Sequence, residues 1–134
     1  MGRGKLRIYL GAAPGVGKTF AMLNEGRRRL ERGTDVVVGY VETHNRPNTA
    51  AQLGELEVVP RRTIVHRGTS FEEMDLDAVL ARGAKVVLVD ELAHTNVPGS
   101  RHRKRWEDVA VLLDHGVDVL STLNIQHLES VNDV

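Results

Sequence analysis

The sequence predicts an α/β fold, a three-layer sandwich in which a mostly parallel sheet carries helices on both faces. Three segments, 33–38, 83–89 and 116–120, support this prediction, because in each a glycine follows a helical pattern and a valine-rich run follows the glycine. A glycine just past a helix accepts the left-handed conformation that ends the helix. The apolar run that follows suits a strand buried on both faces. Helix, glycine and buried strand in repeated order are typical of βαβ units.

Three helices are expected around these strands: one over 18–32, a short one capped by Asp75, and one over 106–115. The pattern at 49–56 fits a further helix after a loop, and 63–66 fits one more strand. The side chains that the three helices would turn toward the core are apolar and helically spaced: Phe20, Leu23 and Leu30, then Leu76, Val79 and Leu80, then Val109, Leu112 and Leu113.

Length and composition narrow the possible functions. The chain has 134 residues, the length of one domain, with 18 Lys+Arg against 18 Asp+Glu. This charge balance argues against a general binder of nucleic acid or anionic membranes. The absence of Cys excludes a disulfide scaffold and thiolate metal sites. No apolar run approaches the roughly 20 residues of a spanning helix, and none follows Met1, so we expect a cytoplasmic protein without direct membrane insertion.

The chain stops just inside a predicted helix. We therefore expect one domain over 1–134, either truncated at its C-terminal end or belonging to a short natural homologue.

A glycine-rich segment, 11–19, lies between an expected first strand at 6–10 and the first helix. It matches the phosphate-binding pattern Gly-x4-Gly-Lys-Thr with Ala12 in the first position. Backbone amides would approach the phosphates, Lys18 would reach the β- and γ-phosphates, and the Thr19 hydroxyl would ligate Mg²⁺. The sequence thus predicts a P-loop NTPase-like fold whose nucleotide-binding residues are Ala12, Ala13, Pro14, Gly15, Val16, Gly17, Lys18 and Thr19.

Two carboxylates follow the apolar strand at 86–89. Asp90 is expected to hold the Mg²⁺ shell, directly or through water, and Glu91 to polarise a water for attack on the γ-phosphate. Ligands gather at the carboxyl ends of parallel strands, where Asn124 would also sense the γ-phosphate. Lys18 and Glu91 are therefore the candidate catalytic residues. Other polar side chains expected at this edge are Glu42, Thr43, His44 and Thr122.

The segment 101–105 is the only dense basic run. It fits a solvated loop, and the alternatives are a contact to nucleotide phosphate, in cis or in trans, and a docking patch for an acidic partner. Six histidines are present, but none forms a zinc-binding spacing. His94 and His44 follow strand ends and are expected to line the nucleotide cleft, whereas His66, His102, His115 and His127 are expected at the surface or at caps.

Several of these strings together resemble one family. They are 10–19, Val41-Glu42-Thr43-His44, Val89-Asp90-Glu91-Leu92-Ala93-His94-Thr95-Asn96, 98–101, 104–106 and Asn124-Ile125-Gln126-His127-Leu128-Glu129-Ser130. The chain resembles, over nearly its whole length, the N-terminal cytoplasmic domain of the KdpD family of potassium-responsive, osmosensitive sensor histidine kinases. The strings at 90–96 and 124–130 are far more specific than the phosphate-binding loop alone.

The resemblance implies a regulatory module that binds ATP and Mg²⁺ at 12–19 with Asp90 and Glu91. In that family the sensor lies in the bacterial inner membrane and belongs to a two-component system that controls high-affinity potassium uptake. ATP binding would tune its balance between kinase and phosphatase activity toward a response regulator. The partners implied are the remaining domains of the sensor and, indirectly, that regulator, with a homodimer formed through the larger protein as an open alternative.

The chain lacks the phosphoacceptor helix and the kinase core, so the resemblance does not make it a histidine kinase by itself. Two other functions stay open. One is a stand-alone P-loop ATPase or small-molecule kinase, which Glu91 would favour. The other is an interaction module in which the run 101–105 docks a partner and nucleotide only stabilises the fold.

Overall fold

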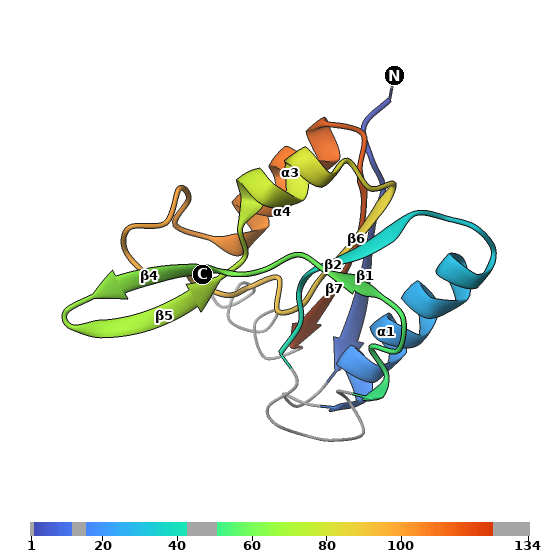
Figure 1. Cartoon of the computed structure of the whole chain (residues 1–134), viewed down its shortest axis with the longest axis horizontal. Coiled ribbons are helices and arrows are strands. Elements are labelled where there is room, and N and C mark those ends of the chain that lie inside the picture. The colour runs from blue at the N-terminus through green and yellow to red at the C-terminus, as the bar shows by residue number, and fades with distance from the viewer. Residues whose placement is uncertain (1, 12–15, 43–50, 125–134) are drawn as a thin grey trace, which may run out of the picture.

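The computed structural model describes residues 2–11, 16–42 and 51–124 (Figure 1). Its main sheet has five strands in the order β1-β7-β6-β2-β3, and all of the strand pairs are parallel. The strands are β1 (Leu6–Gly11), β2 (Val36–Tyr40), β3 (Glu57–Val58), β6 (Val86–Val89) and β7 (Asp118–Asn124). The helices are α1 (Val16–Glu31), α3 (Leu76–Arg82) and α4 (Arg105–Asp114). The predicted α/β architecture is thereby confirmed.

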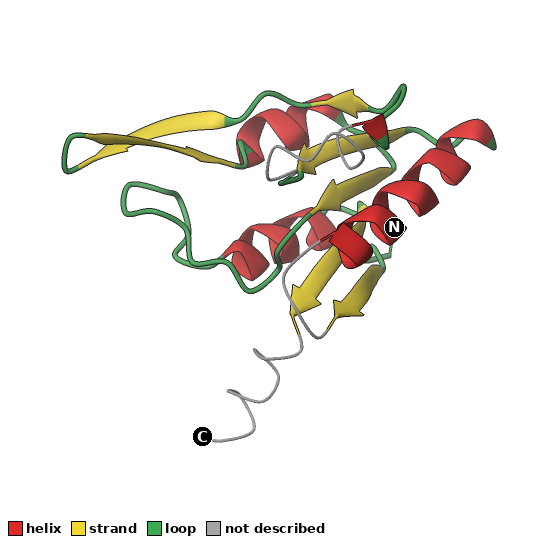
Figure 2. Cartoon of the chain, turned by 90° about the horizontal axis from the view of Figure 1, so that it is seen from below, coloured by secondary structure: helices red, strands yellow, loops and turns green. Residues whose placement is uncertain are grey.

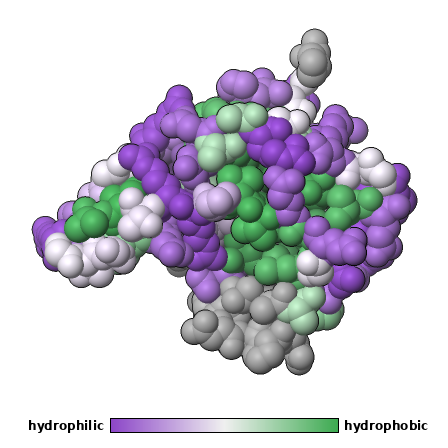
Figure 3. Space-filling model, viewed as in Figure 1, coloured by the Kyte–Doolittle hydropathy of each residue, from purple (hydrophilic) through white to green (hydrophobic). Residues whose placement is uncertain are grey.

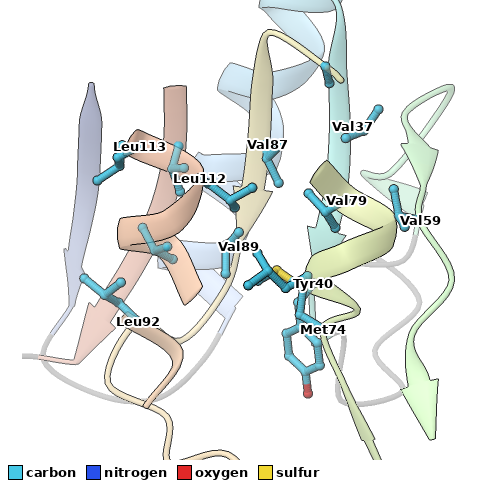
Figure 4. Packing of buried hydrophobic residues seen from close by; sticks show 14 residues of the cluster. Val37, Tyr40, Val59, Met74, Val79, Val87, Val89, Leu92, Leu112 and Leu113 are labelled. Atoms are coloured by element: carbon cyan, nitrogen blue, oxygen red, sulfur yellow. The ribbon is translucent and has the colours of Figure 1, made fainter. Parts of the chain in front are cut away.

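The helices cover opposite faces of this sheet, which makes three layers (Figures 1 and 2). Successive residues of β6 point to opposite faces, as expected for a strand. Val86 and Leu88 pack with Met22 and Leu23 of α1. Val87 and Val89 belong to the second cluster, to which α3 and α4 contribute and which Figure 4 shows from close by. Both faces of the central strands are therefore buried, which explains their continuous valine-rich sequences.

The predicted helix ends are confirmed in detail. Gly33, Gly83 and Gly116 all have positive φ, and the Asp75 carboxylate accepts a hydrogen bond of 3.0 Å from the Ala78 amide. The predicted inward side chains of α3 and α4 are buried, except that Leu80 is only partly buried. The prediction is wrong for Phe20, whose exposed fraction is 38%. Phe20 lies off the inward stripe of α1, which is formed by positions 19, 22, 23, 26 and 30.

Gly26 brings α1 unusually close to the sheet. A Cβ atom built on Gly26 would lie 2.6 Å from Cδ1 of Leu88, which is too short for a real contact. A side chain at this position would have to displace the Leu88 methyl group, so its absence lets α1 pack closely on β6. The close approach helps to set the first turn of α1, with Lys18 and Thr19, beside the carboxyl end of β6.

The strand predicted at 63–66 is confirmed as β4 (Arg62–His66), but it lies outside the main sheet. It pairs antiparallel with β5 (Thr69–Glu73), which the sequence analysis missed, and Arg67 and Gly68 form the two-residue turn with φ of 52° and 77°. Two consecutive left-handed residues are typical of a tight hairpin turn. The β4–β5 hairpin forms an arm that extends away from the sheet (Figures 1 and 2).

The arm exposes apolar side chains, as the space-filling view shows (Figure 3). Val65 is 68% exposed and Phe71 is 40% exposed.

In the part of the chain that the structure describes, no helix has both the length and the apolar character needed to cross a membrane. Of the helix predicted over 49–56, residues 51–56 are described, and only Ala51 is helical.

Candidate functional site

The candidate site lies at the carboxyl edge of the main sheet, because all five strands run in the same direction. β1 ends at Gly11 and the next described residue, Val16, begins α1. Asp90 follows β6, and Asn124, the last residue of β7, stands in register beside Gly11. Ala12, Ala13, Pro14 and Gly15 of the predicted loop, with Thr43, His44 and His127, lie outside the described residues.

Thr19 and Asp90 contact each other at this edge. Both are buried, with exposed fractions of 6% and 2%. The Thr19 hydroxyl donates to the carboxylate of Asp90, at 3.2 Å from Oδ1 and 3.1 Å from Oδ2. These residues are 71 positions apart, and both were predicted from the sequence to hold Mg²⁺. Their contact brings together two oxygen ligands of the kind that Mg²⁺ prefers.

Asp90 is held by two further donors. The Thr122 hydroxyl donates to Oδ1, and the Glu42 amide donates to Oδ2 at 3.2 Å. Two of the residues expected to converge at the strand ends therefore contact Asp90. Thr122 does so through its side chain and Glu42 through its main-chain amide. A carboxylate fixed by three donors is pre-oriented, which an ion site requires of its ligands.

Lys18 lies against the end of β1. A Cβ atom built on Gly11 would fall 2.4 Å from Cγ and 2.5 Å from Cδ of Lys18, so the lysine stem occupies the space that a side chain at position 11 would take. The Lys18 side chain thus passes back over the end of the first strand, on the side where the loop begins. Gly17 has no neighbour within 4 Å of a built Cβ among the described atoms.

Glu91 has a strained backbone. Its φ is 57°, a left-handed value that glutamate rarely adopts, and its side chain is 42% exposed. Two hydrogen bonds hold the turn: the Asp90 amide donates to the Tyr40 carbonyl at 2.8 Å, and the Glu91 amide donates to the Thr122 hydroxyl at 2.9 Å. Strain of this kind persists where the surrounding contacts enforce it and is frequent at functional sites.

The basic run 101–105 is not a solvated loop as a whole. Arg105 is fully buried, so that part of the prediction is wrong. Arg101 pairs with Asp77 at 2.9 Å, and Lys104 donates to the Thr95 hydroxyl at 2.6 Å. His102 contacts Asp108 at 2.6 Å through Nδ1. Burial removes Arg105 from the candidate contacts to a phosphate or to an acidic partner.

Arg105 and Glu73 form a buried ion pair that the sequence analysis missed. Nη2 of Arg105 donates to Oε1 of Glu73 at 3.0 Å, with exposed side-chain fractions of 0% and 7%. His94, expected in the nucleotide cleft, instead contacts Glu73 through Nε2 at 2.9 Å. Burial alone would raise the pKa of Glu73, but the hydrogen bonds from His94 and Val97 and the charges of His94 and Arg105 hold that pKa below its usual value.

The chain matches the family described as "Osmosensitive K+ channel His kinase sensor domain" over residues 2–134. It is 64% identical over 132 residues to the sensor protein KdpD of Mycobacterium tuberculosis (strain H37Rv) and 56% identical to that of Escherichia coli K12. Each match covers 98% of this chain and 15% of the relative. A putative sensor protein KdpD of Synechocystis is 54% identical, with 36% of its length covered. The chain belongs to the family of KdpD osmosensitive potassium-channel histidine-kinase sensor domains.

Proposed function

We propose that the chain is a regulatory module that binds ATP with Mg²⁺ within a two-component sensor kinase. The observation that carries this proposal is the contact of Thr19 with Asp90, which joins the residue after the loop lysine to the acidic end of β6. This is the arrangement in which P-loop proteins hold the nucleotide-bound Mg²⁺. The buried, oxygen-rich surroundings of Asp90 fit such an ion.

Each residue has a distinct task in this proposal. The backbone N–H groups of the loop (Pro14 has none) and the Lys18 ammonium would bind the phosphates. Thr19 and Asp90 would hold the ion, and Asn124 would sense the γ-phosphate. When bound, Mg²⁺ would neutralise part of the phosphate charge. Thr122 and the Glu42 amide keep the Asp90 carboxylate oriented. A module that only reports nucleotide needs a difference in affinity between two states and no turnover.

The chain spans only 15% to 36% of the length of these KdpD relatives, so the role of the whole protein belongs to the proposal. According to this proposal, the domain lies on the cytoplasmic side of a sensor in the bacterial inner membrane. Nucleotide binding changes its contacts with the remaining domains and thereby the balance between kinase and phosphatase activity toward a response regulator. The output is control of high-affinity potassium uptake. A homodimer formed through the longer protein is compatible with this role.

A second candidate is ATP hydrolysis or transfer of phosphate to a small molecule. Glu91 favours it, because its strained backbone and part-exposed carboxylate follow directly on Asp90. Such a carboxylate can orient a water or an acceptor hydroxyl for attack on the γ-phosphate.

Calorimetry of ATP-Mg²⁺ binding, with phosphate release followed on the same sample, tests the proposal. We expect Lys18→Ala to abolish binding, because the phosphates lose their only side-chain cation within the loop. Lys85→Ala is the matched control, since Lys85 precedes β6 at the opposite edge of the sheet. Negligible turnover supports a sensor, whereas turnover that Glu91→Gln removes while binding persists supports the second candidate. Unchanged binding in Lys18→Ala would contradict both.

A further inference from the structure

Arg105 is the residue that connects the candidate nucleotide site with the β4–β5 hairpin. Its Nη1 donates to the main-chain carbonyl of Asp90 at 2.9 Å, and its Nη2 donates to Glu73, the last residue of the hairpin. Its guanidinium lies over the Tyr40 ring, 3.9 Å from the centroid. One rigid planar group therefore contacts the end of β6, the end of β2 and the base of the hairpin.

Glu73 extends this connection to the segment after the acidic pair. Besides Arg105, its carboxylate contacts Nε2 of His94 at 2.9 Å and accepts a hydrogen bond from the Val97 amide at 2.9 Å. In the described part of the chain, β4 and β5 pair only with each other and with no strand of the main sheet. The orientation of the hairpin therefore depends strongly on contacts at its base, where Glu73 is the buried charged residue of the hairpin itself.

The guanidinium of Arg105 retains one unsatisfied donor among the described residues. Nη1 lies 4.0 Å from Oε2 of Glu91, which is beyond hydrogen-bonding distance. Its Nε is buried and has no hydrogen-bond partner among the described residues. A buried donor without a partner costs free energy, so this arrangement is less stable than one in which Nε is satisfied. The adjacent turn at Glu91 is strained as well.

We propose that Arg105 is a positioning residue for the Asp90–Glu91 turn and that its ion pair with Glu73 couples nucleotide binding to the β4–β5 hairpin. This inference rests on the proposed function. Binding of ATP-Mg²⁺ at Asp90 shifts the turn whose carbonyl Arg105 holds. The guanidinium moves with that carbonyl, and Glu73 carries the movement into β5. The hairpin is then the part of the domain whose position reports the nucleotide state.

Hydrogen–deuterium exchange of peptides covering 62–73, with and without ATP-Mg²⁺, tests the coupling. We expect nucleotide to change exchange at the hairpin base by about fivefold or more, the lower range of couplings between sites. Glu73→Gln keeps the shape of the side chain and removes its charge, so the response falls toward zero while calorimetry still shows binding. Glu72→Gln is the matched control with an unchanged response, because this neighbour is 60% exposed and pairs with Arg61 at 3.2 Å.

The possible results separate the coupling from the proposed function. Wild type that binds ATP-Mg²⁺ without any change at 62–73 overturns the coupling and leaves the function standing. A wild-type response that persists in Glu73→Gln also overturns it. Failure of wild type to bind removes both proposals, and calorimetry identifies that case. If Glu73→Gln does not fold, as judged by circular dichroism, Arg105→Lys replaces it, with the same loss expected because lysine lacks the two-pronged geometry.

Discussion

Replacing Arg105 by alanine is expected to lower the free energy of unfolding by about 3–5 kcal/mol, the usual cost of removing one partner from a buried ion pair. The Glu73 side chain is only 7% exposed in the structure, and the substitution leaves its carboxylate without the guanidinium that neutralises it. It also removes the donor to the Asp90 carbonyl. Because a domain of this size is stable by only about 5–15 kcal/mol, the loss is severe. Urea unfolding followed by far-UV circular dichroism measures it.

Arg82→Ala is the matched control for this prediction. Arg82 also bridges two acidic side chains, Asp35 and Glu57, with contacts of 2.8 Å, but its side chain is 32% exposed. Pairs in contact with water contribute little, since solvent replaces the lost partner. We expect a much smaller decrease than for Arg105→Ala. Equal decreases in the two variants would show that burial of the Arg105–Glu73 pair is not what makes it important.

Replacing Asp90 by asparagine is expected to weaken ATP binding in the presence of Mg²⁺ by about 10- to 100-fold, the range typical of damaged metal-site residues. Asparagine presents an NH₂ group where Asp90 accepts hydrogen bonds from Thr19, Thr122 and the Glu42 amide. One of these donors then faces another donor, and the charge that attracts the ion is lost. Calorimetry at fixed Mg²⁺ measures the affinity.

Asp118→Asn serves as the control for Asp90→Asn. Asp118 begins β7 at the opposite edge of the sheet, where its Oδ1 accepts from the Lys5 amide at 2.9 Å. Its substitution is expected to leave ATP affinity unchanged. If Asp90→Asn bound ATP-Mg²⁺ as tightly as wild type, Asp90 would have no part in holding the ion.

Local signals in the sequence were sufficient to predict four strands of the main sheet and its three helices, whereas the two-residue strand β3 was missed. The glycines at 33, 83 and 116 end helices through their own backbone freedom, and Asp75 caps the helix that follows it by accepting from the amide three residues on. The hairpin strand β5 was missed because its sequence, Thr-Ser-Phe-Glu-Glu, contains one apolar residue and shows no alternation. What defines β5 is its pairing with β4 across the turn at Arg67 and Gly68.

The candidate site was only partly predictable, because some of its contacts, like the pairing of β5, have no local sequence pattern. Thr19 and Asp90 belong to motifs whose spacing carries their chemistry, so their contact could be expected across 71 positions. The Arg105–Glu73 pair has no such signature. An arginine within a basic run is usually exposed. Only the tertiary arrangement, in which the start of α4 lies against the end of β6, buries Arg105 beside a glutamate 32 residues away.

The affinity for ATP measured with and without Mg²⁺, for wild type and Thr19→Ala, tests the central proposal most directly. The Thr19 hydroxyl contacts Asp90 and carries no charge, so its removal affects the ion more than the phosphates. We expect Mg²⁺ to strengthen ATP binding to wild type by about tenfold or more, and this gain to fall toward zero in Thr19→Ala. Equal ATP affinity of wild type with and without Mg²⁺, or no binding at all, would contradict the assignment of Thr19 and Asp90 to a nucleotide-bound ion.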